Sequence, residues 1–290
     1  MPERDESQQP TGEPTTDPTA EATPAQQETP AHPEPAQPVD GTPRASETSP
    51  KPRFRDAPVS FVRRSHRMSD AQEKAWEENS PLYLVEVPRS FASTSVDPEV
   101  EVDPAELFGR AAPLTVEIGS GQGHAIVHAA SAHPERNFLA IEVYRAGLAR
   151  TVFNAHSAGL TNLRLVDANA PEVLSTFLPA GSVDEVWIFF PDPWHKKRHT
   201  KRRMVKEGFP EVLHRALSDG GRVRLASDWE DYALQMREVL DAADGFEREF
   251  DGEWAPRFDG RVMTAFERKG LEKGREIRDL VYRRTPLAQD

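Results

Sequence analysis

The feature that most constrains this chain is the stretch TVEIGSGQG at residues 115–123, where an apolar strand runs directly into three alternating glycines. A strand that ends in such a loop and continues into a helix brings bare backbone close to a small ligand, which side chains would obstruct. Gly119, Gly121 and Gly123 are therefore candidates for a ligand-binding loop. A single glycine-rich loop is also compatible with an ordinary tight turn, so the stretches that follow decide its interpretation.

From Leu114 onward, short apolar runs alternate with helical patterns at the intervals typical of a parallel sheet. We predict an α/β fold with a seven-stranded, mostly parallel sheet and helices on both faces. The predicted strands cover residues 114–118, 138–143, 162–166, 185–190 and 222–226, with a last pair near 246–250 and 277–282. The predicted helices cover residues 123–133, 145–158, 170–178, 202–217 and 229–243, with Gly220-Gly221 ending the fourth helix.

Residues 1–50 differ in composition from the rest of the chain. They contain eleven prolines and carry −8 of the net charge of −12, so we predict a disordered acidic tail. Residues 51–110 are predicted to form a basic arm and a helical segment starting near Ser69, and residues 111–290 the main domain. The sequence has no cysteine, no signal-peptide pattern and no apolar run of about 18 residues, which indicates a cytoplasmic protein.

Polar residues lie at or just beyond the carboxyl ends of four predicted strands and should meet at one end of the sheet. They are Glu117, Glu142, the Asp167-Ala-Asn169 turn and Asp192. A dinucleotide would require the spacing G-x-G-x-x-G, but His124 occupies the last position. S-adenosylmethionine has no diphosphate, and the Glu142 carboxylate can accept from both ribose hydroxyls, so we favour this ligand. Either Asp167 or Asn169 is a candidate for contact with adenine. Each acid alone is also compatible with an exposed strand end or a helix cap.

A stiff aromatic segment, FFPDPW at residues 189–194, places Asp192 between two prolines. The prolines restrict the backbone and the aromatic rings can stack on a flat base, although a rigid loop with its tryptophan in the core is the simpler alternative. Residues 195–206 contain seven Lys or Arg and no acid, which favours phosphate binding beside an extruded RNA nucleotide. His195 and His199 lie within this cationic run, so we interpret them as facing solvent or phosphate, not a metal.

These motifs resemble those of the bacterial tRNA (guanine-N7-)-methyltransferases over roughly residues 58–284. The stretches that carry the resemblance are Ser60–Arg64, Val116–Gly123, Ile141–Val143, Phe189–Arg203, Ser227–Glu230 and Thr264–Glu267. The resemblance implies a Rossmann-like class I methyltransferase fold and transfer of a methyl group from S-adenosylmethionine to guanine 46 in the variable loop of tRNA. It implies no metal, and it leaves open whether the protein is a monomer or a homodimer.

The resemblance also implies roles for individual residues. Donor binding would fall on the glycine loop, Glu117, Glu142, Asn169 and Asp192. Substrate binding would fall on Lys196, Asp228, Thr264, Ala265, Phe266 and Glu267, and RNA contact on Arg198, His199, Thr200, Lys201, Arg202 and Arg203. Asn169 replaces the expected aspartate, which predicts a modest loss of donor affinity. Without the resemblance, Asp228 is a candidate helix N-cap and residues 264–267 the start of a surface helix.

The chemistry of guanine N7 sets the mechanism that we expect. N7 has an in-plane lone pair and no proton to lose, so orientation and not a general base should lower the barrier. Asp192 is the predicted catalytic residue, stabilising the cationic product base or hydrogen-bonding to the base edge, while Asp228 and Glu267 could accept from guanine N1 and N2. Two alternatives stay open: an exocyclic-amino RNA methyltransferase that uses the same donor, and a non-catalytic RNA-binding protein with this fold.

Overall fold

A computed structural model describes residues 68–287. The predicted acidic tail at residues 1–50 lies outside the described residues, as do residues 51–67 of the predicted basic arm, which include the Ser60–Arg64 motif. The domain boundaries therefore stay predictions.

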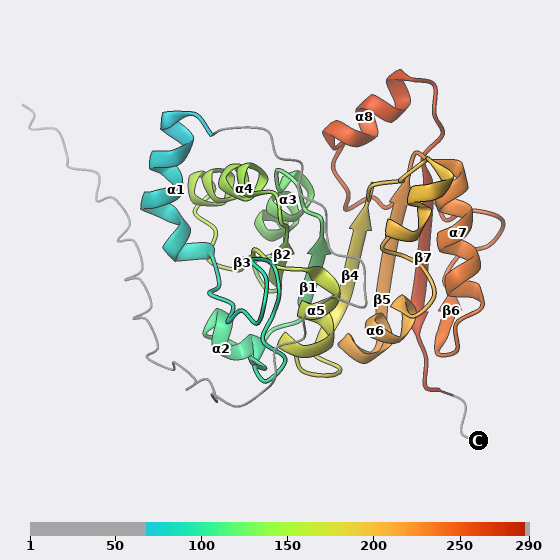
Figure 1. Cartoon of the computed structure of the whole chain (residues 1–290), viewed down its shortest axis with the longest axis horizontal. Helices are drawn as coiled ribbons and strands as arrows, with labels where there is room; N and C mark the ends of the chain where they lie inside the picture. Colours follow the sequence, from blue (N-terminus) through green and yellow to red (C-terminus); the bar gives the residue numbers. More distant parts are fainter. Residues whose placement is uncertain (1–67, 288–290) are drawn as a thin grey trace, which may run out of the picture. The chain divides into compact units, whose positions relative to one another are not determined.

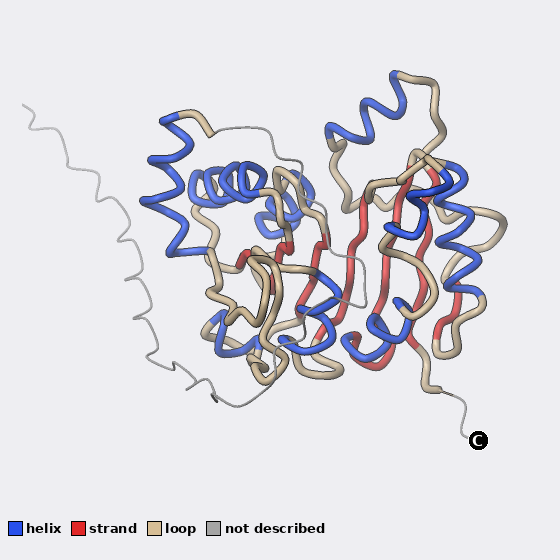
Figure 2. Tube along the Cα trace, in the orientation of Figure 1, coloured by secondary structure: helices blue, strands red, loops and turns tan. Residues whose placement is uncertain are grey.

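A seven-stranded sheet forms the centre of the described structure, with helices packed on both of its faces (Figures 1 and 2). The strand order is β3-β2-β1-β4-β5-β7-β6, and only β7 runs antiparallel to its neighbours. The predicted α/β Rossmann-like fold is confirmed. The strands are β1 (Leu114–Ile118), β2 (Asn137–Ile141), β3 (Leu163–Val166), β4 (Val183–Phe189), β5 (Leu217–Ser227), β6 (Phe246–Arg248) and β7 (Arg278–Arg284).

Two apolar clusters cover the two faces of the sheet. One contains side chains from α1 (Asp70–Tyr83), α3 (His124–Ala132) and α4 (Arg145–Ser157). The other contains side chains from α2 (Pro104–Phe108), α5 (Ala170–Glu172), the π-helical turn η1 (Val173–Phe177), α6 (Phe209–Ala216) and α7 (Glu230–Asp241). Alternate residues of β1 point to opposite faces, and Leu114, Val116 and Ile118 belong to the second cluster. Glu117 therefore points to the face that carries α3 and α4.

The strand order reverses between β1 and β4, because consecutive strands spread outward from β1 on one side and from β4 on the other. In open α/β sheets, ligands bind beyond the carboxyl ends of the strands at this switch point. The last helix, α8 (Ala265–Glu272), lies beyond these ends, above β4 and β5 in Figure 1. The fold therefore brings the glycine loop, the segment after β4 and α8 to one end of the sheet.

The predicted helix at residues 202–217 is wrong in both position and length. Residues Lys197–Arg202 form a short 3₁₀ helix, η2, and α6 begins only at Phe209. Pro210 explains the late start, because proline is tolerated in the first turn of a helix but not in its interior. The glycine pair that we expected to end the helix lies inside β5, where a β-carbon on Gly221 would approach the Ser218 carbonyl oxygen to 2.9 Å. Helix α2 was not predicted at all.

Candidate active site

The glycine loop between β1 and α3 has the open backbone that the sequence predicted. Gly119, Gly121 and Gly123 have φ angles of 71°, 57° and 73°, which favour glycine. A β-carbon on Gly119 would meet no atom within 4 Å, whereas one on Gly123 would lie 2.5 Å from the Thr151 side chain on α4. Gly119 therefore leaves backbone accessible to a ligand, and Gly123 allows a helix to pack against the loop.

A fourth glycine, Gly147 on α4, contributes to this loop and was not singled out in the sequence. A β-carbon at Gly147 would lie 2.3 Å from the Gly121 carbonyl oxygen. Its own carbonyl accepts a hydrogen bond from the Thr151 hydroxyl at 3.1 Å. The available signal was a lone glycine within a predicted helix, which often has a packing reason.

Glu117, the second-last residue of β1, carries a buried carboxyl group and is 4% exposed, next to the glycine loop. Its Oε2 atom is buried and has no hydrogen-bond partner. Burial raises the pKa of Glu117 to about 8, the backbone N–H of Ile126 lowers it, and the nearby Glu142 raises it. A buried carboxyl oxygen without a partner is costly, and a cationic or hydrogen-bond-donating ligand would satisfy it. S-adenosylmethionine, which carries an ammonium group and ribose hydroxyls, has hydrogen-bond donors that would satisfy this oxygen.

Glu142 follows β2 and is tied to the loop by backbone hydrogen bonds. Its Oε2 accepts from the N–H of Gly121 at 2.8 Å, and its Oε1 accepts from Val143 at 2.7 Å and Tyr144 at 2.9 Å. Burial raises the pKa of Glu142, and these bonds oppose the rise. A carboxylate has about four lone-pair positions, so one remains for a ligand hydroxyl, and not the two that the predicted contact with both ribose hydroxyls requires.

The turn after β3 holds Asn169 rigidly. Asn169 is 2% exposed and donates from its side-chain amide to Glu172 at 2.9 Å, and its backbone N–H bonds the Thr94 carbonyl. Asp167 is partly buried, which raises its pKa, while the nearby Arg89 and Arg145 lower it. The structure thus places both adenine candidates beside Glu142 at the ends of neighbouring strands, since β3 pairs with β2.

The segment after β4 is a strained turn around Asp192. Phe190 and Trp194 have φ angles of 53° and 45°, a left-handed conformation that bulky residues rarely adopt. Asp192 lies between them and is exposed. Trp194 is only half-buried, with the Arg202 guanidinium 5.0 Å from its ring centroid, so it is not a core residue. Strain of this kind concentrates at functional sites.

The basic run after this turn divides into exposed and buried residues. Lys196, Arg198 and Lys201 are exposed, and His199 and Thr200 are partly exposed. Arg203 is only 2% exposed, and protein groups engage its guanidinium. The predicted RNA contact of Arg203 is thus at odds with its burial, whereas the other residues of the run remain accessible.

Helix α8 begins where the sequence indicated, with Thr264 as its N-cap. The Thr264 hydroxyl accepts from the N–H of Glu267 at 3.1 Å. The Glu267 side chain is 1% exposed, and both its oxygens accept from Arg257 and Arg261. These two arginines lower the pKa of Glu267 against the effect of burial. Arg261 also pairs with Asp279 on β7, so Glu267 belongs to a buried ionic network.

Two contacts place α8 against the rest of the site. A β-carbon on Gly121 would lie 4.0 Å from the ring of Phe266, which is 61% exposed. A β-carbon on Gly270 would lie 2.8 Å from the Cβ atom of Asp228, which follows β5. The Asp228 Oδ2 atom accepts from Arg275 at 2.7 Å. Asp228 is not the N-cap of α7, because Trp229 takes that position without a side-chain cap.

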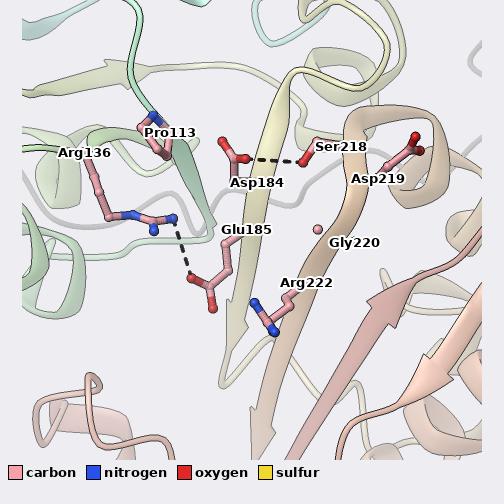
Figure 3. Close-up of a pocket in the computed structure, with 9 residues that line it drawn as sticks. Pro113, Arg136, Asp184, Glu185, Ser218, Asp219, Gly220 and Arg222 are labelled. Atoms are coloured by element: carbon pink, nitrogen blue, oxygen red, sulfur yellow. Dashed lines mark hydrogen bonds and ion pairs between the residues drawn. The ribbon is translucent and has the colours of Figure 1, made fainter.

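A pocket of about 240 Å³ lies at the other end of the sheet (Figure 3). It is formed where β1, β4 and β5 begin, and some of its polar groups pair with one another. Ser218 donates to Asp184 at 3.3 Å, and Arg136 lies 4.0 Å from Glu185. The glycine loop, the Asp192 turn and Asp228 lie at the carboxyl ends of the strands, so this pocket is separate from the candidate active site.

Across residues 68–287, no group of three or more His, Asp and Glu side chains is arranged to hold a metal ion. None of the helices in this part of the chain combines the length and the apolar character needed to cross a membrane.

Comparison with known proteins shows the family. A sequence model described as a putative methyltransferase matches residues 111–280. A tRNA (guanine-N(7)-)-methyltransferase of Paenarthrobacter aurescens is 45% identical over 275 residues, covering 78% of this chain and 91% of that protein. A protein of the same name from Cutibacterium acnes is 44% identical, covering 80% and 85%. The chain belongs to this family.

Among solved structures, the 16S rRNA methyltransferase KamB is 18% identical with a TM-score of 0.47, covering 62% of this chain and 92% of that chain.

S-adenosylmethionine is the methyl donor of the tRNA (guanine-N(7)-)-methyltransferase family. The resemblance inferred from the sequence motifs is therefore confirmed.

Proposed function

We propose that this chain transfers a methyl group from S-adenosylmethionine to N7 of guanine 46 in the variable loop of tRNA. The observation that carries the proposal is the set of features found at the carboxyl end of the sheet. An open glycine loop and the unpartnered, buried carboxyl group of Glu117 lie at the same end as the strained Asp192 turn and the exposed cationic run. Identities of 44–45% with tRNA (guanine-N(7)-)-methyltransferases support the reaction and the substrate. A tRNA substrate in turn supports a cytoplasmic location.

Three residues on the donor side are suited to hold S-adenosylmethionine. When bound, this donor supplies a methyl group on a cationic sulfonium. Glu117 contributes the carboxyl oxygen that has no hydrogen-bond partner. Glu142 contributes the one lone-pair position that its three hydrogen bonds from backbone N–H groups leave open. Asn169, whose side-chain amide is held by Glu172 in the turn after β3, is the candidate for contact with adenine. Gly119 leaves space for close approach of the backbone.

Asp192 is the catalytic residue in this proposal. Guanine N7 carries no proton, so the protein has to orient the base and stabilise the positive charge that develops on it. An exposed carboxylate on a turn with strained residues on both sides satisfies both needs, because its direction is set before the substrate arrives.

Asp228 is the better candidate for reading the guanine edge. Only its Oδ2 atom is engaged among the described residues, by Arg275, and its side chain is 19% exposed. Glu267 has both oxygens occupied by two arginines at 1% exposure. We therefore assign base recognition to Asp228 and assign Glu267 to the ordering of α8, with Phe266 exposed on that helix for stacking.

The test uses labelled S-adenosylmethionine with an unmodified tRNA transcript, followed by borohydride reduction and aniline cleavage, which cuts at N7-methylguanine. The expected result is incorporation with one cut in the variable loop. A transcript with adenine at position 46 is the matched control and should give neither. Label without a cut would indicate amino methylation, and donor binding without incorporation would indicate a non-catalytic RNA-binding protein.

A further inference from the structure

Arg203 stands at the end of the cationic run but has a different environment from its neighbours. Its guanidinium is 2% exposed and has protein partners on all three nitrogens. Nε donates to the Pro193 carbonyl at 2.8 Å, Nη1 donates to the Gln235 side chain at 2.7 Å, and Nη2 pairs with Asp231. Its guanidinium carbon also lies 4.8 Å from the centroid of the Tyr232 ring. At 2% exposure, the Arg203 side chain is not accessible to an RNA phosphate in this conformation.

Three of these four partners belong to α7, and the fourth belongs to the turn that carries Asp192. Pro193 directly follows Asp192 and precedes Trp194, whose φ angle is 45°. Proline has no N–H, so its carbonyl is the only main-chain group through which the protein can hold this residue. Arg203 therefore connects the catalytic turn to a helix that packs on the sheet.

The opposite end of the turn is held by other contacts. The N–H of Phe190 donates to the Ala226 carbonyl on β5 at 2.8 Å, and the Arg261 guanidinium lies 5.5 Å from the Phe190 ring. Left-handed residues of this kind cost about 1–3 kcal/mol each and persist only where the surroundings hold them. Without Arg203, the Pro193 carbonyl at the carboxyl end of the turn would lose its hydrogen bond to the Arg203 guanidinium.

We propose that Arg203 is a positioning residue: it holds the Asp192 turn in its reactive conformation through the Pro193 carbonyl, and it does not contact RNA. This inference rests on the proposed function, in which Asp192 acts on the guanine. The guanidinium is suited to the task because its planar fork donates in three directions at once, which a lysine ammonium on a flexible stem does not reproduce. Misplacing a catalytic group by about 1 Å can cost about 10²-fold in rate.

The experiment compares Arg203→Ala and Arg203→Lys with Arg198→Ala in the full-length protein. The first two variants should lower kcat for tRNA methylation by about 10²-fold and leave tRNA affinity, its salt dependence and donor affinity at wild-type values. Millimolar guanidinium should restore part of the kcat of Arg203→Ala only. Arg198→Ala, which removes an exposed cation, should weaken tRNA binding and reduce the slope of log affinity against log salt by about 0.7–0.9.

A reduced salt slope in Arg203→Ala, like that of Arg198→Ala, would make Arg203 an RNA contact and overturn the inference. Wild-type kcat in Arg203→Lys would also overturn it, and this variant decides the question if Arg203→Ala does not fold. Absence of tRNA methylation by the wild-type protein would overturn the proposed function, and the inference with it. If the wild-type protein methylates tRNA in the same assay, a contrary result from the Arg203 variants overturns only the inference and not the proposed function.

Discussion

The donor side and the acceptor side of the site are built in different ways. On the donor side, at the ends of β1 and β2, glycines and backbone N–H groups shape the loop. Within residues 68–287, neither Glu117 nor Glu142 forms an ion pair there. On the acceptor side, near the ends of β4 and β5, buried arginines form ion pairs with carboxylate side chains. Arg203 pairs with Asp231, and Arg261 with Glu267 and Asp279.

This difference indicates what each side tolerates. Close backbone packing leaves no room for added volume, so the donor side should be sensitive to the size of a side chain. A buried ionic network requires its charges to balance, so the acceptor side should be sensitive to charge even where shape is preserved. The predictions below test this contrast, in order of decreasing effect.

Glu267→Gln should produce the largest effect. The substitution preserves shape but leaves Arg257 and Arg261 without their shared carboxylate, and we expect a loss of about 3–5 kcal/mol in the free energy of unfolding. Urea denaturation measures this loss. Glu272→Gln, at an exposed position on the same helix, is the control and should stay within about 0.5 kcal/mol of wild type. A loss below 1 kcal/mol for Glu267→Gln would show that the network contributes little.

Asp192→Ala should lower kcat by roughly 10²–10³-fold, because it removes the charge that stabilises the cationic base. Donor affinity, measured by calorimetry, should stay within a few fold of wild type, because other residues hold the donor. Asp231→Asn, on the same side of the site, tests whether the effect is specific to Asp192: it should act through Arg203 and produce a smaller loss. Wild-type turnover in Asp192→Ala would contradict the assignment.

Gly147→Ala adds one carbon on the donor side. The new β-carbon would lie 2.3 Å from the Gly121 carbonyl oxygen, so we expect a loss of about 1–3 kcal/mol in stability together with weaker donor binding. Gly109→Ala is the matched control: its φ angle is 66°, yet a β-carbon would meet no atom within 4 Å. It should cost about 1–2 kcal/mol through backbone strain alone and leave donor affinity unchanged. Equal donor affinities in the two variants would contradict the packing argument.

The smallest effect, measured over the single unit between pH 6 and pH 7, concerns the pH dependence of stability. The pKa of Glu117 rises from 4.5 to about 8 in the folded protein, so between these values the folded chain keeps a proton that the unfolded chain has released. Stability of the ligand-free protein should therefore fall as pH rises through this window, by at most about 1.4 kcal/mol per pH unit from this group. Glu117→Gln should remove this contribution, as measured by unfolding at pH 6 and pH 7. An unchanged slope in the variant would assign the pH dependence to other groups.

The sequence alone predicted the sheet, most of its strand positions and the gathering of the donor-side residues. Apolar runs set by local periodicity predicted β1 and β4 to within two residues at each end, and the parallel order then places strand-end residues such as Glu117 and Glu142 together. The site assignments themselves stay predictions.

Only the tertiary structure determined which charged residues are accessible to a substrate and which are buried in contacts that hold the fold together. Arg203 and Arg198 belong to the same cationic run in the sequence, yet one is buried and the other exposed. The partners that decide this are distant along the chain: 28 residues separate Arg203 from Asp231, and 47 separate Arg275 from Asp228. Local propensity carries no information about such pairings, because burial and charge neutralisation depend on elements that meet only when the chain has folded.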